Sequence, residues 1–100
     1  MGRQRMDLDA IFRSIVSNVY FQPPENLKLT YPCIIYSRDY TIKRAADNGT
    51  YAIHKRYLVT VIDRSPDSAL FDKVLWLPQC QHLRSFTKDQ LNHSVYNLFY

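Results

Sequence analysis

The segment Tyr57-Leu-Val-Thr-Val-Ile-Asp-Arg-Ser-Pro-Asp-Ser68 joins a strand signal directly to a helix-start signal. Its first six residues are apolar on nearly every position and rich in β-branched side chains, which is typical of a central strand covered on at least one side. The next residues predict a helix, with Ser65 as its N-cap, Pro66 as its first residue and Asp67 as an acid that complements the helix dipole. The apolar stripe of this helix would comprise Leu70, Phe71, Val74, Leu75 and Leu77, and Pro78 would end it.

Upstream, the strand is one arm of a predicted hairpin. The arm runs from residue 51 to residue 62, and Asp47-Asn-Gly49 is a strong hairpin-turn signal between it and a strand over 40–45. Another short strand is predicted over 31–36, where Pro32 requires a strand start or a sheet edge.

The two ends of the chain carry further elements. Apolar residues recur with helical spacing from Leu8 to Val19, which predicts an amphipathic helix over 7–19, capped by Asp7 or Asp9. Residues 1–6 are expected to form a flexible basic terminus. Near the other end, strands are predicted over 82–86 and 95–100 with a connection over 88–93, and a helical turn is the alternative for the last stretch.

These elements predict an α+β fold in the order α-β-β-β-α-β-β. The sheet should be mostly antiparallel, with both amphipathic helices packed on one face. Because 100 residues make one typical domain and no linker divides them, we expect residues 1–100 to form a single domain.

The composition narrows the class of function. The chain is 46% hydrophobic and 22% charged, which is ordinary for a globular protein, and it has no apolar run of membrane-spanning length. No secretory signal follows the basic N-terminus, so we expect synthesis in the cytoplasm and no membrane association. Aromatic residues reach 14%, which favours a partner-binding surface, and the net charge of +4 permits contact with nucleic acid without requiring it.

Motifs for catalysis or cofactor binding are missing from the sequence. It has no phosphate-binding glycine loop, G-x-S-x-G, H-E-x-x-H or C-x-x-C. Cys33 could pair with His54, His82 or His93 as nucleophile and base, but a buried core thiol is much the commoner role. Cys80 and His82 would share a strand face as half of a zinc site, yet no second ligand pair accompanies them. We therefore expect no cofactor, no metal, no catalytic residue and no enzymatic activity.

A cluster of basic residues marks the predicted hairpin: Lys43, Arg44, His54, Lys55 and Arg56. Pairing of the two arms would gather them into a basic ribbon. Two interpretations stay open at even odds. The ribbon is either a solvated edge with aggregation-blocking charges or an arm that docks on an acidic partner or beside DNA phosphates. Tyr40, Tyr51 and Tyr57 could stack on a partner or form cross-strand pairs.

Before the last strand, Asn92 and His93 have a structural interpretation. A buried His93 would most simply hydrogen-bond the backbone and fix the loop geometry.

The joint order of several short motifs resembles a known family. The motifs are Tyr31-Pro-Cys-Ile-Ile-Tyr36, Ala46-Asp-Asn48, the segment from Tyr57 to Ser68 with its Ser65-Pro66-Asp67, Leu77-Pro78 with Cys80, and Asp89-Gln-Leu-Asn-His-Ser-Val-Tyr96. Over residues 7–100 they look like the small neck and tail-completion proteins of long-tailed bacteriophages, of the tail terminator type.

The resemblance implies a structural role in the virion neck, after assembly in the host cytoplasm. Tail terminators are small α+β subunits that form hexameric rings, cap the tail tube and present a surface to the head connector. DNA passes through the channel without sequence-specific binding, and the family has no catalytic residues to transfer. The alternatives are a head-side connector or stopper of the same neck, a small nucleic-acid-binding module, and a small enzyme as the least favoured class.

Overall fold

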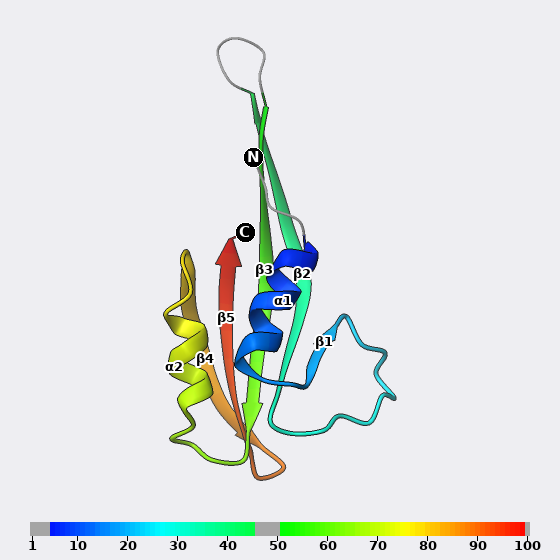
Figure 1. Ribbon diagram of the computed structural model, residues 1–100, viewed down its shortest axis with the longest axis vertical. Helices are drawn as coiled ribbons and strands as arrows, with labels where there is room; N and C mark the ends of the chain where they lie inside the picture. The colour runs from blue at the N-terminus through cyan, green and yellow to red at the C-terminus, as the bar shows by residue number, and fades with distance from the viewer. Residues whose placement is uncertain (1–4, 46–50, 100) are drawn as a thin grey trace.

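A computed structural model describes residues 5–45 and 51–99 of the chain, and the side chains of 5–39 and 55–99. Its elements are α1 (Arg5–Ile15), β1 (Val19–Phe21), β2 (Cys33–Ala45), β3 (Tyr51–Asp63), α2 (Ala69–Leu75), β4 (Cys80–Lys88) and β5 (Leu91–Phe99). The strands form one sheet in the order β1-β2-β3-β5-β4 (Figure 1). β1 is parallel to β2 and the other neighbouring pairs are antiparallel. The predicted α+β class and element order are confirmed.

Of the three strands predicted before α2, the one over 51–62 is confirmed as β3, but the first two differ. The segments 31–36 and 40–45 belong to a single strand, β2, interrupted by a register shift between Arg38 and Tyr40. The strand that was not predicted is β1, which begins at Val19, the last residue of the predicted first helix. Pairing decides this: the backbone N–H of Ile34 donates to Asn18 at 2.9 Å, which draws residues 19–21 alongside β2.

The chain ends also differ in their boundaries. Arg5 and Met6, expected within a flexible terminus, lie in the first turn of α1. The predicted connection over 88–93 shrinks to the two residues Asp89 and Gln90, both with positive φ (53° and 65°), because β4 and β5 pair up to Lys88 and Leu91. The last segment is a strand, as predicted, and not a helical turn.

Both helices pack on the same face of the sheet (Figure 1). Phe12 of α1 is fully buried and meets Tyr36 of β2 edge to face, with 5.1 Å between ring centroids. Val74 is the fully buried residue of α2. The central strand β3 contributes Tyr57, Val59 and Val61, whose alternation with half-buried Leu58 and Thr60 shows one strand face turned to the helices. Neither helix in the described part of the chain has the length and hydropathy to span a bilayer.

The second helix begins later than predicted. Its N-cap is Ser68, whose hydroxyl accepts a hydrogen bond from the Leu70 backbone N–H at 3.3 Å, so the assignment of Ser65 as cap and Pro66 as first helical residue is wrong. Ser65 instead closes a local turn, in which its hydroxyl accepts from the Asp67 N–H. The acid in the first helical turn is Asp72, and Asp67 precedes the helix. Two candidate caps three residues apart explain the error, because both suit an N-terminus equally well by sequence.

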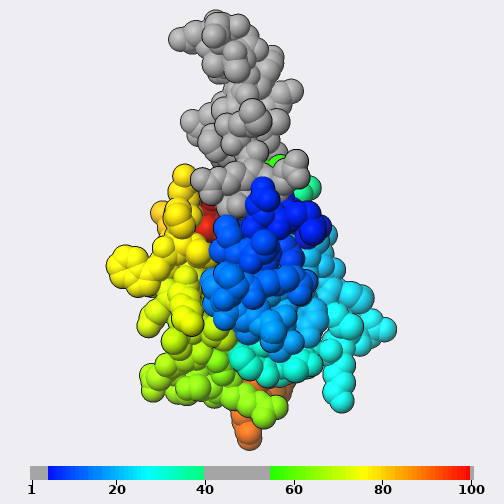
Figure 2. Space-filling model, viewed as in Figure 1, coloured from blue at the N-terminus to red at the C-terminus, as the bar shows by residue number. Residues whose placement is uncertain are grey.

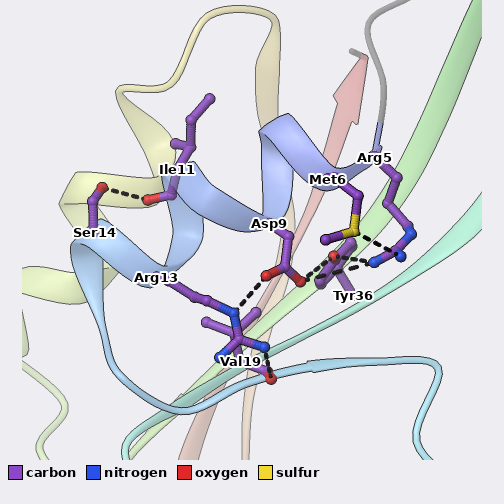
Figure 3. A network of polar contacts seen from close by, with 8 residues as sticks. All are labelled: Arg5, Met6, Asp9, Ile11, Arg13, Ser14, Val19 and Tyr36. Carbon is purple, nitrogen blue, oxygen red and sulfur yellow. Dashed lines mark hydrogen bonds and ion pairs between the residues drawn. The ribbon is translucent and has the colours of Figure 1, made fainter.

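A buried carboxylate fastens α1 to the sheet (Figure 3). Asp9 is 8% exposed; it accepts hydrogen bonds from Arg13 Nε and, at 2.6 Å, from the hydroxyl of Tyr36 on β2. Arg5 Nη1 lies 3.9 Å from the carboxylate and donates to the Tyr36 hydroxyl at 3.1 Å. Burial by itself would raise the pKa of Asp9, but the hydrogen bonds from Tyr36 and Arg13 and the two guanidinium charges hold it below its ordinary value.

Candidate functional site: a basic ribbon and an apolar sheet edge

The central hairpin extends beyond its own sheet. β2 and β3 pair from Cys33↔Ile62 to Ala45↔Tyr51, whereas β5 pairs with β3 only between Arg56 and Asp63. The pieces Thr41–Ala45 and Tyr51–Lys55 therefore form a two-stranded projection, named here the ribbon (Figure 1). Five residues of strand span about 17 Å. Two strands without a third are marginally stable alone, so a ribbon of this kind gains stability from a surface to lie on.

The ribbon carries basic residues and no acidic one. Its sequence includes Lys43, Arg44, His54 and Lys55. In the strand register Lys43 is opposite Ile53 and Lys55 is opposite Thr41, which puts positions 43 and 55 on one face and positions 44 and 54 on the other. Of the predicted interaction residues, Lys43, Arg44, Tyr51 and His54 have side chains outside the described set. Their backbones lie on the paired strands β2 and β3.

At the base of the ribbon, Arg56 is already engaged. Its Nη2 lies 2.8 Å from Asp39 Oδ2 across the register shift in β2. The pair is about one-third exposed, so it holds the start of the ribbon to the sheet while contributing little net charge to a partner. Lys55 is half-buried beside it.

The opposite end of the strand order presents an apolar edge. β4 is an outer strand, and residues 81–90 are all exposed. Among the residues whose side chains are described, six large hydrophobic ones are exposed, and four of them lie on α2 and β4 or at the C-cap between them: Leu75, Trp76, Leu83 and Phe86. Trp76 is 84% exposed, which is unusual for the side chain with the most apolar area to lose. We name this region the β4 edge. An exposed cluster of this kind marks an interaction site more often than a free surface.

A groove of about 510 Å³ runs between α2 and β4 within this region. Its apolar lining includes Phe71, Leu75 and Phe86. Among the described residues that line it, Asp72 is the one with a formal charge at neutral pH. Because polar residues of β4 and β5 complete the lining, the groove suits a segment that combines apolar and polar groups with a positive charge beside Asp72.

A hydrogen-bonded chain of polar side chains lines the same groove. His82 Nε2 is 2.8 Å from Ser85 Oγ, and Ser85 Oγ is 3.0 Å from Ser94 Oγ on β5. Residues three apart on a regular strand point to opposite faces, but the register shift at Leu83 brings His82 and Ser85 to the same face. Sequence reasoning missed this pair because a bulge leaves no clear signal in one sequence.

A serine next to a histidine is the start of a catalytic triad. In the described part of the chain, however, no carboxylate is hydrogen-bonded to His82, and the serine hydroxyl is shared with a second serine. The contact between Ser85 and Ser94 joins β4 to β5 at the wall of the groove.

The motif residues near the C-terminus tie β5 to its surroundings. Asn92 Nδ2 donates to the carbonyl of Arg64 at 3.1 Å, and the hydroxyl of buried Tyr96 donates to the carbonyl of Phe71. His93 Nδ1 lies 3.1 Å from the Leu91 carbonyl, and its ring stacks on Phe86 at 4.6 Å. His93 makes the expected backbone contact, although it is half-buried and not buried. Asn92 holds the loop after β3 and Tyr96 holds α2, whereas His93 contacts its own strand and Phe86 of β4.

The cysteines are poorly suited to nucleophilic chemistry. Both thiols are free; Cys33 is buried and Cys80 half-buried. Burial raises the pKa of each to about 11, so the thiolate is scarce at neutral pH. Across residues 5–39 and 55–99, whose side chains are described, no group of three or more metal-binding side chains is gathered.

No protein-family model and no curated protein matches the chain. Its function is therefore inferred from its own residues.

Proposed function

We propose that this protein is a structural subunit of a bacteriophage virion, of the tail terminator type. Copies of it would form a ring, with six subunits as the resemblance implies, that caps the tail tube and joins it to the head-side connector. The protein would act in the neck of the virion by binding, without catalysis, cofactor or metal, and DNA would pass through the ring without sequence-specific contacts.

The observation that supports this proposal best is the ribbon. It extends past the sheet that stabilises its base, its sequence is basic without an acidic residue, and strand pairing supplies neighbours only within itself. Such an arm is of use to a protein that docks on another surface, and a tube end or a neighbouring subunit offers one. The order of the short sequence motifs supports the more specific identity as a tail terminator.

The apolar β4 edge supports assembly independently of the ribbon. An exposed tryptophan such as Trp76, at 84% exposure, and an open strand edge such as that of β4 are surfaces that a ring subunit would bury against its neighbour.

Electron microscopy of tail tubes built without this protein tests the proposal. Added protein should appear as a ring at one tube end, and tubes that stay bare would refute it. Reversing charge on one ribbon face, with Lys43→Glu and Lys55→Glu together, should reduce capping more than it lowers thermal stability. Arg64→Glu with Lys73→Glu is the matched control, because it makes the same charge change at exposed residues outside both the ribbon and strand β4.

Two other functions remain in competition. A head-side connector or stopper of the same neck would bind isolated heads and leave tubes uncapped. A nucleic-acid-binding module is favoured by the basic ribbon alone; it would bind DNA as a single subunit, with an affinity that falls steeply as salt rises. Capping of tubes with weak, salt-insensitive DNA binding would exclude both.

A further inference from the structure

We propose that the β4 edge of one copy receives the segment Gln22–Pro32 of the next copy, so that these two surfaces join the subunits. This inference rests on the proposed ring and names the contact that would close it.

The receiving surface is defined by shape and charge. Leu75 and Phe71 of α2 line the groove, Trp76 follows Leu75 in the chain and is exposed, and the outer backbone of β4 has no neighbouring strand in the described sheet. Beside these apolar residues and the polar groups of β4 and β5, Asp72 is exposed, and no ion pair joins it to another described residue. A partner segment should therefore bring apolar side chains and one cation.

The stretch Leu27–Leu29 of the segment between β1 and β2 has this chemistry. It presents Leu27, which is 42% exposed, followed by the exposed Lys28 and the half-buried Leu29, and the exposed Glu25 lies outside this stretch, three residues before Lys28. No ion pair joins Lys28 to another described residue. The segment is held in place by hydrogen bonds from the Leu27 N–H to the Pro24 carbonyl and from the Thr30 N–H to the Tyr20 hydroxyl. Such a prearranged segment loses less conformational entropy on binding than a free one.

The two surfaces lie on opposite sides of the molecule. β1 and β4 are the two ends of the strand order, and in Figures 1 and 2 the segment after β1 projects from one side while the end of α2 borders the other. Two different patches on opposite sides cannot satisfy each other within a two-copy pair. Each copy instead leaves one patch open for the next, which is the heterologous contact from which closed rings are built.

The proposed contact between Lys28 and Asp72 can be tested by exchanging the two charges. Lys28→Glu would put a carboxylate against Asp72, and Asp72→Lys would put an ammonium against Lys28, so each should weaken association by about fivefold per interface. The double variant Lys28→Glu/Asp72→Lys restores the pair in reverse and should associate within about twofold of the original. Lys73→Glu is the control: it changes charge by the same amount as Lys28→Glu on an exposed residue next to Asp72 that does not line the groove.

Sedimentation measures association, and fluorescence locates it, because Trp76 is the sole tryptophan of the chain. The Trp76 emission should move to shorter wavelength as copies associate. Association can be followed with the protein alone at high concentration, or on tail tubes that carry neither this protein nor any tryptophan. Circular dichroism confirms that each variant is folded.

Each result has a distinct meaning. Loss in both single variants with recovery in the double variant supports the contact. Rings that form equally well in every variant, with Trp76 emission unchanged, overturn this contact and leave the proposed function intact. A particle that stops at two copies also overturns it, because the contact would then be reciprocal. Protein that neither associates nor caps tubes overturns the proposed function together with the contact.

Discussion

Tyr36→Phe removes one hydroxyl from the interior and should lower the free energy of unfolding by about 2 kcal/mol. That hydroxyl donates to Asp9 Oδ2 at 2.6 Å, and without it the oxygen keeps only Arg5 at 3.9 Å, beyond hydrogen-bond distance. A hydrogen bond to a charged group contributes about 1.5–3 kcal/mol, and the ring packing against Phe12 stays in place. For a domain of this size the loss corresponds to about 10 °C in melting temperature.

Tyr57→Phe is the matched control. Tyr57 is equally buried on the same sheet face, with its ring centroid 6.0 Å from that of Tyr36, but its hydroxyl has no hydrogen-bond partner among the described residues. Removing a buried, unpaired hydroxyl should leave stability unchanged or raise it. Thermal and urea unfolding followed by circular dichroism measure both variants. Equal losses in the two would show that the contact with Asp9 does not stabilise α1 on the sheet.

The same contact predicts a pH dependence. A carboxyl whose pKa is lower in the folded than in the unfolded chain stabilises the fold above its unfolded pKa, about 3.9, and this contribution is lost as the pH falls through the folded value. Because the Tyr36 hydroxyl helps to lower the pKa of Asp9, stability of the original chain should fall more steeply below about pH 4 than that of Tyr36→Phe. Urea unfolding at a series of pH values gives the free energy of unfolding as a function of pH. Parallel curves for the original chain and Tyr36→Phe would contradict this account of Asp9.

Three further predictions concern local structure. Ser68→Ala should cost about 1 kcal/mol of unfolding free energy, because it removes the helix cap, and Ser65→Ala should cost clearly less; the reverse order would restore the earlier assignment of the cap. Gln90→Gly should raise stability by about 0.5–1 kcal/mol in the same assay, since φ at this turn position is 65° and glycine adopts it without strain; a loss would show that the glutamine side chain stabilises the turn. Cys33 should resist thiol reagents in the folded protein and Cys80 should react first, as mass spectrometry of timed samples would show, because Cys33 is fully buried; equal rates would contradict its burial.

Much of the fold follows from local pattern. The helical spacing of Leu8 and Phe12, the β-branched run of β3 and the proline and glycine signals are properties of neighbouring residues, and they suffice for the class and the element order. Where sequence reasoning erred, two local solutions were nearly equal. Val19–Phe21 suits the end of a helix or a short strand, and Ser65 and Ser68 are both good caps.

The candidate surfaces divide in the same way. The sequence shows the basic residues of the ribbon directly, and it allowed the backbone contact of His93 to be predicted. The β4 edge was not foreseen, because exposure of Trp76 and Leu83 depends on which strand lies outermost, and that order is not written in any local pattern. The His82–Ser85–Ser94 chain in the groove depends on a bulge that shifts the register between β4 and β5 by one residue.

The sequence by itself therefore determined the fold class, the two helices in outline, the strand β3 and the last two strands, because these follow from side-chain chemistry over a few residues. Tertiary structure alone decided that β1 joins β2, that β4 is left as an open edge, and that the hairpin outruns its sheet. Each of these features depends on which distant segments pair with one another. The free energy of such a pairing comes from contacts that exist only once the chain is folded.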